Sequence, residues 1–160
     1  MVHLIRLLSR SPSETTEAGR VLGESLSAGD VVALSGELGS GKSVIARGIL
    51  RSLGVAGDIP SPSFVIVAAY EGRMPVNHID LYRVNSADEA AGLGLEELLY
   101  SEAVSVIEWA DKAEDLLPLA RIDVMMESAI EPDDRLITVG AVDPRTRRRL
   151  MAFARALAGF

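Results

Sequence analysis

GELGSGKS, residues 36–43, lies between a strand-like run, VVALSG (31–36), and a helix-like run, SVIARGILRSL (43–53). The first run is short, continuous and apolar, as in a buried parallel strand. In the second run, apolar residues recur at helical spacing. The stretch between them fits G-x-x-x-x-G-K-[ST], the phosphate-binding P-loop, in the strand and helix context that this loop requires. The sequence therefore predicts a phosphate site where the strand passes into the helix.

The residue types in this loop explain why it suits a triphosphate. Its glycines let the backbone wrap until successive N–H groups point inward, and the helix that follows adds the positive end of its dipole. In this pattern, the ammonium of Lys42 reaches the β- and γ-phosphates, and the hydroxyl of Ser43 is a ligand for Mg²⁺. We therefore predict a nucleotide-binding segment made of Gly36, Glu37, Leu38, Gly39, Ser40, Gly41, Lys42, Ser43 and Val44.

Two acidic residues compete for the metal side of the site. In VNHID (76–80), alternation places Asp80 on the same strand face as His78, so Asp80 is a candidate for Mg²⁺. In VSVIE (104–108), Glu108 ends an apolar run, as the metal-side acid of a P-loop protein commonly does. The pattern favours Glu108 for the metal. It leaves open the reverse division, with Asp80 at the metal and Glu108 orienting water.

Two further features accompany these acids. SPSF (61–64) precedes a predicted strand, and Ser63 is a candidate switch residue that senses the γ-phosphate; ordinary turn chemistry explains the segment equally well. Trp109 is the only tryptophan, and it directly follows Glu108. Packing at the strand end and contact with a ligand are both open to it.

The rest of the chain predicts an α/β fold, a P-loop NTPase-like three-layer domain with a mixed, largely parallel sheet flanked by helices. One such domain spans residues 1–160, because no linker-like stretch divides the chain. Helices are predicted where capping residues precede helical periodicity, and strands where apolar runs lie between turn residues. The predicted strands are 3–9, 31–36, 64–70, 74–82, 103–109, 121–128 and 135–141, and the main helices are 11–27, 43–53 and 144–157.

Composition limits the function further. The chain has no cysteine, its net charge is −7, and it contains no apolar run long enough to span a membrane. We therefore expect a cytoplasmic protein without membrane association, which repels nucleic acid overall. One basic run, Arg145 to Arg149, stands out in this acidic chain. Contact with phosphate groups or an acidic partner is one interpretation of the run, and a solvated face of the last helix is the other.

GELGSGKS, SPSF, HIDLYR (78–83) and VIEW (106–109), in this order and spacing, resemble the TsaE (YjeE) family of small bacterial P-loop ATPases. The resemblance covers residues from about 14 to 125. It implies a role in making N6-threonylcarbamoyladenosine on tRNA, alongside TsaB and TsaD-like proteins. It implies that ATP or ADP and Mg²⁺ bind, and that tRNA is reached indirectly through the complex. It also implies that the ATPase is weak alone and that its nucleotide cycle is needed for repeated turnover by its partners.

Residue by residue, the resemblance assigns Lys42 and Ser43 to phosphate and Mg²⁺, Asp80 to the metal shell and Glu108 to hydrolysis, with Trp109 near the nucleotide. This division between the two acids is the reverse of the one that the pattern favours. With both readings kept, the predicted catalytic set is Lys42, Asp80 and Glu108, and the predicted metal set is Ser43, Asp80 and Glu108. The family commonly has threonine at the positions of Ser43 and Ser63. Serine retains the hydroxyl that the chemistry requires.

Two other functions fit a P-loop. A small-molecule kinase would transfer the phosphate to a hydroxyl group instead of water, and Arg145 to Arg149 is the only run suited to an arginine-rich lid. A nucleotide-gated adaptor would bind ATP with negligible hydrolysis. A GTPase is disfavoured, because no N-K-x-D guanine-reading motif occurs in the sequence.

Overall fold

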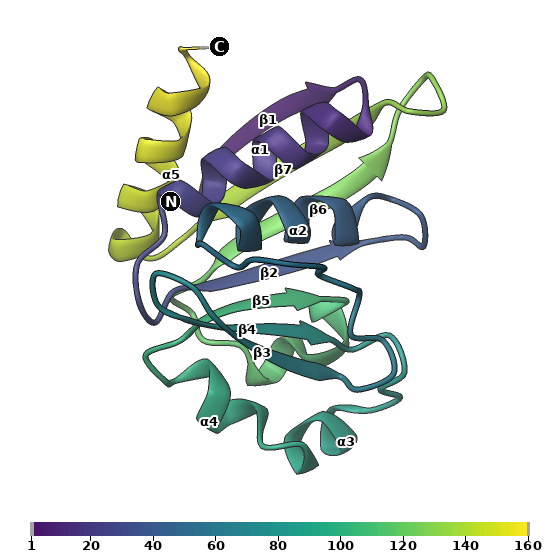
Figure 1. Cartoon of the computed structure of the whole chain (residues 1–160), viewed down its shortest axis with the longest axis vertical. Helices are drawn as coiled ribbons and strands as arrows, with labels where there is room; N and C mark the ends of the chain where they lie inside the picture. The colour runs from purple at the N-terminus through teal and green to yellow at the C-terminus, as the bar shows by residue number, and fades with distance from the viewer. Residues whose placement is uncertain (1, 160) are drawn as a thin grey trace.

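A computed structural model describes residues 2–159 of the chain. It is a three-layer α/β fold in which one seven-stranded sheet lies between two groups of helices (Figure 1). Its strands are β1 (His3–Ser9), β2 (Val31–Gly36), β3 (Val67–Glu71), β4 (Pro75–Asp80), β5 (Val104–Glu108), β6 (Ile122–Ser128) and β7 (Arg135–Ala141). Its helices are α1 (Pro12–Glu24), α2 (Lys42–Ser52), α3 (Ala87–Gly92), α4 (Leu95–Leu99), the 3₁₀ helix η1 (Ala110–Leu116) and α5 (Pro144–Leu157).

The sheet order is β1-β7-β6-β2-β5-β4-β3. The pairings at its centre, β6 with β2, β2 with β5 and β5 with β4, are parallel. The pairings toward both edges are antiparallel. This arrangement confirms the predicted mixed sheet. Because the central strands run in one direction, the carboxyl ends of β2, β4 and β5 meet at one edge of the sheet, where α/β proteins bind ligands.

Apolar side chains fill the space on both faces of the sheet. On one face, α1, α2 and α5 pack over the sheet through residues such as Leu22, Ile49 and Phe153, which are buried. On the other face, η1, α3 and α4 enclose a smaller cluster that includes Ile79 and Leu95. Burial of these side chains from water is the main favourable contribution to the fold.

Helix starts follow the predicted capping chemistry. The hydroxyl of Ser11 accepts a hydrogen bond from the backbone N–H of Glu14 at 3.1 Å, and Ser86 caps α3 through Glu89 in the same way. The carboxylate of Glu14 accepts from the N–H of Arg10, one residue before the cap. In a capping box the glutamate would accept from the N–H of the cap residue itself, so only the serine half of the pattern is formed at Ser11.

One strand prediction is wrong. Phe64 to Ile66, expected at the start of a strand, form a turn closed by N–H groups of Val65 and Ile66 on the carbonyl of Pro62. Ile66 has a φ of 68°, which strands do not allow, and its carbonyl accepts from the N–H of Asp80. Strand β3 therefore begins only at Val67. The β-branched and aromatic side chains favoured a strand, but contact with the end of β4 turns the backbone.

Glycines allow α1 and α2 to pack very closely, and this packing fixes the position of the P-loop helix. A Cβ at Gly48 would overlap the carbonyl oxygen of Thr16, and one at Gly19 would overlap the carbonyl of Ile45. Each substitution must push the helices apart, because the obstructing atom belongs to the backbone.

We expect Gly48→Ala to lower the free energy of unfolding by about 1–3 kcal/mol, as overpacking of a well-packed core does. Urea unfolding followed by circular dichroism measures the change. Gly92→Ala is the matched control: Gly92 also lies in a helix, but a Cβ there meets nothing within 4 Å. A Gly48→Ala protein as stable as the wild type would show that close helix contact is not required.

Candidate functional site

The loop between β2 and α2 has the backbone shape that its glycines predict. Gly36, Gly39 and Gly41 have φ values of 142°, 79° and 102°, in the region that glycine tolerates. A Cβ at Gly36 would overlap the carbonyl of Met126 on β6, so glycine is also needed there for space. No side chain caps α2, whose N-cap is Gly41. The N–H groups of its first turn therefore face the loop, as in anion-binding helix starts.

Lys42 lies inside this loop and is 5% exposed. Its ammonium donates to the carbonyls of Gly36 and Glu37 at 2.6 and 2.7 Å, and it lies 3.3 Å from the hydroxyl of Ser40. It also lies 3.8 Å from the ring centroid of Trp109. Burial lowers the pKa of Lys42, and the charges of nearby carboxylates oppose this shift. The lysine is thus a desolvated cation held at the centre of the loop.

Glu108, at the end of β5, joins the loop to β4. Its Oε1 accepts a 2.6 Å hydrogen bond from the hydroxyl of Ser43, and its Oε2 lies 2.6 Å from Nε2 of His78. Glu108 and His78 are buried, with 1% and 0% of their surface exposed. The sequence had placed His78 beside Asp80, but its side chain contacts Glu108.

Asp80 lies beside Glu108 in the parallel register of β4 and β5. Its Oδ2 accepts hydrogen bonds from Ser61 at 2.9 Å and Ser63 at 3.1 Å, and its Oδ1 accepts from the N–H of Tyr82. The predicted switch residue Ser63 is therefore bonded to one of the two candidate metal acids. A change at Asp80 is transmitted directly to the SPSF segment.

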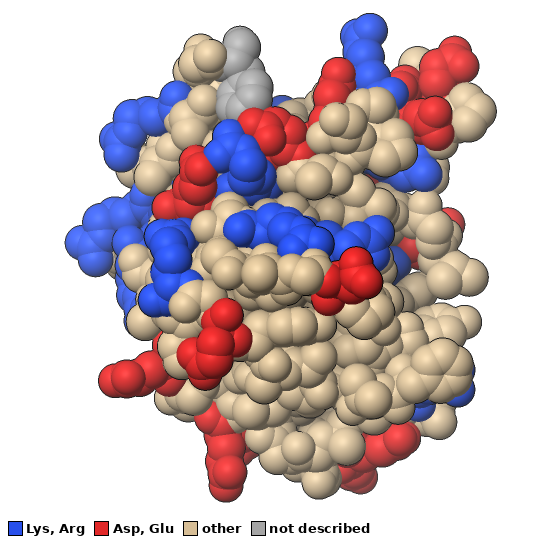
Figure 2. Space-filling model, in the orientation of Figure 1, with Lys and Arg blue, Asp and Glu red and all other residues tan. Residues whose placement is uncertain are grey.

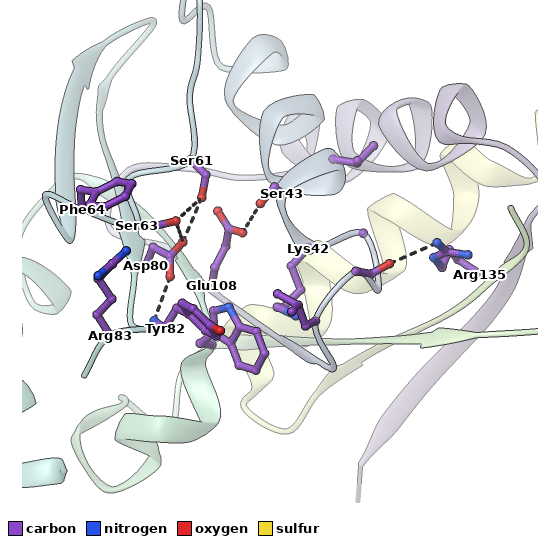
Figure 3. Close-up of a pocket in the computed structure, with 15 residues that line it drawn as sticks. Lys42, Ser43, Ser61, Ser63, Phe64, Asp80, Tyr82, Arg83, Glu108 and Arg135 are labelled. Carbon is purple, nitrogen blue, oxygen red and sulfur yellow. Dashed lines mark hydrogen bonds between the residues drawn. The ribbon is translucent and has the colours of Figure 1, made fainter. Parts of the chain in front are cut away.

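These groups border a cavity of about 460 Å³ (Figure 3). Ser43 and Glu108 point toward one another at its centre, Asp80 meets Ser61 and Ser63 at one end, and Arg135 lies at the other end, across the loop. Ten predicted residues line the cavity: Leu38, Gly39, Gly41, Lys42, Ser43, Val44, Ser63, Asp80, Glu108 and Trp109. The other three predicted residues are Gly36, Glu37 and Ser40, and each is a hydrogen-bond partner of the Lys42 ammonium.

Five cavity-lining residues were not predicted from sequence: Ser61, Phe64, Tyr82, Arg83 and Arg135. Arg135 donates to the carbonyl of Gly39 at 3.1 Å, and Arg83 lies 4.2 Å from the ring centroid of Phe64. Tyr82 and Arg83 belong to HIDLYR, so the motif itself offered a signal for them. Nothing local marked Arg135, because its partner lies 96 residues away in the chain.

The oxygen atoms at this site suit a magnesium ion. Ser43, Asp80 and Glu108 offer a hydroxyl and two carboxylates, which are hard ligands. Among residues 2–159, no three His, Cys, Asp or Glu side chains form a metal-binding group. Mg²⁺ commonly binds one or two carboxylates together with substrate phosphates, and does not need a cage made of protein alone. The donor set therefore fits Mg²⁺ bound with a nucleotide.

The basic run lies apart from the cavity, none of whose lining residues it supplies. Arg145 and Arg149 each lie 2.9 Å from the carboxylate of Asp30, which is buried at the start of β2. Figure 2 shows basic side chains gathered over the side of the molecule where α5 lies. Two arginines of the run therefore pair with Asp30 and hold α5 against the start of β2, and both interpretations of the run stay predictions.

A mostly parallel central sheet, a glycine-rich loop before α2 and two acids at neighbouring strand ends define the P-loop class of α/β proteins. A family model described as "Threonylcarbamoyl adenosine biosynthesis protein TsaE" matches residues 9–137. The chain belongs to the TsaE family.

Relatives and a solved structure agree with this assignment. Proteins named tRNA threonylcarbamoyladenosine biosynthesis protein TsaE from Treponema pallidum and Bacillus subtilis are each 35% identical to the chain. Each comparison covers 84% of this chain, with 99% and 84% of the respective relatives. The Mycobacterium bovis protein of the same name is 41% identical over 78% of this chain and 80% of its own length. The crystal structure of Bacillus subtilis YdiB matches with a TM-score of 0.85 and 29% identity, covering 98% of this chain and 97% of that one.

A transmembrane helix has to be long and apolar. No helix within residues 2–159 combines the length and the hydropathy of a membrane span.

Proposed function

We propose that this protein is a Mg²⁺-dependent ATPase that serves tRNA threonylcarbamoyladenosine synthesis and is activated by TsaB and TsaD-like partners. The observation that carries the proposal is the convergence of Lys42, Ser43 and Glu108 in one cavity at the start of α2. Membership of the TsaE family supports the pathway. The same membership supports a cytoplasmic protein that reaches tRNA through its partners.

The cavity supports a division of labour among its residues. The loop N–H groups and Lys42 bind the phosphates, since both offer positive charge to the same space. Mg²⁺ would neutralise charge on the β- and γ-phosphates. The hydrogen bond between Ser43 and Glu108 brings their oxygens together, so both residues would hold the ion. Glu108 would also orient the attacking water, and Asp80, which accepts a hydrogen bond from Ser63, would be the third residue at the ion.

The proposal is tested by ATP hydrolysis with Mg²⁺, measured for the protein alone and then with TsaB and TsaD from the same organism. Weak hydrolysis alone that rises with both partners is expected, because the cavity is open to solvent at residues such as Leu38 and Phe64, which are 75% and 82% exposed. Either partner alone, at the same concentration, is the control. Hydrolysis that partners leave unchanged would contradict activation, and phosphate appearing on a hydroxyl acceptor would indicate a kinase.

A further inference from the structure

His78 is a buried polar side chain on β4, the strand next to the edge strand β3, and the proposed function gives it no role. Strand β4 carries it between two neighbours, opposite Ala68 of β3 and Val106 of β5. Pairing on both sides holds its backbone, and none of its surface is exposed. The backbone that carries the ring is therefore held rigidly, as precise active-site geometry requires.

The ring makes one hydrogen bond. Nε2 lies 2.6 Å from Oε2 of Glu108, while Nδ1 is buried and has no partner among residues 2–159. With Glu108 ionised, its carboxylate only accepts hydrogen bonds, and the proton of this bond lies on Nε2 of His78. The bond is charge-assisted, and such bonds are shorter and stronger than those between neutral groups.

This bond leaves Glu108 with its two oxygens in different surroundings. Oε2 faces His78 inside the sheet, and Oε1 faces Ser43 at the cavity. Several side-chain torsions separate the carboxylate of Glu108 from its backbone, so the strand alone does not fix where Oε1 points. A partner on Oε2 removes that freedom and directs Oε1 toward the space where the metal and the phosphates bind.

We propose that His78 is a positioning residue that holds Oε2 of Glu108, so that Oε1 is aimed at the metal and the attacking water. The inference rests on the proposed ATPase function and deepens it. His78 does not touch the substrate in this scheme. It acts through Glu108, as outer-shell partners of metal-binding carboxylates do.

The test compares two replacements that differ in where they place a donor. The side-chain nitrogen of glutamine reaches about as far as Nε2 of histidine, whereas that of asparagine stops near the position of Nδ1. We expect His78→Asn to lower kcat for ATP hydrolysis with partners by about 10- to 100-fold, as loss of outer-shell support does. We expect His78→Gln to retain most of the wild-type kcat, and both variants to keep the wild-type Kd for ADP, measured by calorimetry without Mg²⁺.

A second measurement needs neither nucleotide nor metal. The chain has only two histidines, so the ring N–H signals of His78 are readily assigned by NMR with a His3→Gln variant. We expect a slowly exchanging Nε2–H proton in the wild type, and its loss from that position in Glu108→Ala. Ser105→Ala is the matched control: within the described residues 2–159 its hydroxyl is buried on the neighbouring strand without a partner, so we expect its removal to leave both the signal and kcat unchanged.

The outcomes separate the inference from the proposed function. Equal kcat values for wild type, His78→Asn and His78→Gln would overturn the positioning role while leaving the ATPase intact. Equal losses in both variants, accompanied by weaker ADP binding, would overturn it in favour of general support of the fold. A wild type that hydrolyses no ATP even with its partners would overturn the proposed function, and this role with it.

Discussion

We expect the replacement of Lys42 with alanine to weaken ATP and ADP binding by about 100-fold, the equivalent of losing charge-assisted hydrogen bonds worth nearly 3 kcal/mol. Two effects add in this variant. The phosphates lose the buried cation at the centre of the loop. The carbonyls of Gly36 and Glu37 also lose the donor that draws them together, so the loop is less organised for its ligand.

Isothermal titration calorimetry with ADP and with ATP measures this loss. Arg47→Ala is the matched control, because it removes another cation from α2 without changing any residue that lines the cavity. Circular dichroism shows whether the variants are folded. A folded Lys42→Ala protein with wild-type affinity would mean that triphosphate binds elsewhere.

Glu108→Gln is expected to lower the rate of ATP hydrolysis by about 100-fold or more, the usual contribution of a group that activates the attacking water. The substitution keeps the size of the side chain and removes its charge. Binding of ADP persists, because the loop and Lys42 supply the phosphate contacts. Single-turnover hydrolysis with partners present separates the chemical step from product release.

Nucleotide binding by Asp80→Asn, measured with and without Mg²⁺, tests how the two acids divide their roles. If Glu108 serves the water and Asp80 only the metal, Asp80→Asn weakens Mg²⁺-dependent binding more than Mg²⁺-free binding. Glu127→Gln, an exposed acid on β6, is the control for loss of one negative charge. Wild-type hydrolysis by Glu108→Gln would contradict the role proposed for this carboxylate.

Local signals made much of the fold predictable. The P-loop with its flanking strand and helix, the serine-capped helix starts and the strands predicted at 121–128 and 135–141 depend on neighbouring residues, and all of them occur in the structure. The turn at Phe64–Ile66 depends on the end of β4, which lies more than ten residues later in the sequence, so strand propensity alone predicted it wrongly.

The candidate site divides in the same way. The sequence named the loop, Asp80 and Glu108 because the loop follows a strand and each acid ends one. It could not show that His78 faces Glu108, because that contact is set by the register of β4 against β5. Likewise, the link from Arg135 to Gly39 and the pairing of Arg145 with Asp30 arise only when distant segments pack together.

The indole of Trp109 gives the protein an optical probe of its own. It is the only tryptophan in the chain. The ammonium of Lys42 lies 3.8 Å from the centroid of its ring, and the centroid of the Tyr82 ring lies 5.1 Å from the same point. Its fluorescence therefore originates entirely beside the loop. Any ligand that draws the lysine away from the ring changes the emission, so occupancy of the loop can be followed in real time without a label.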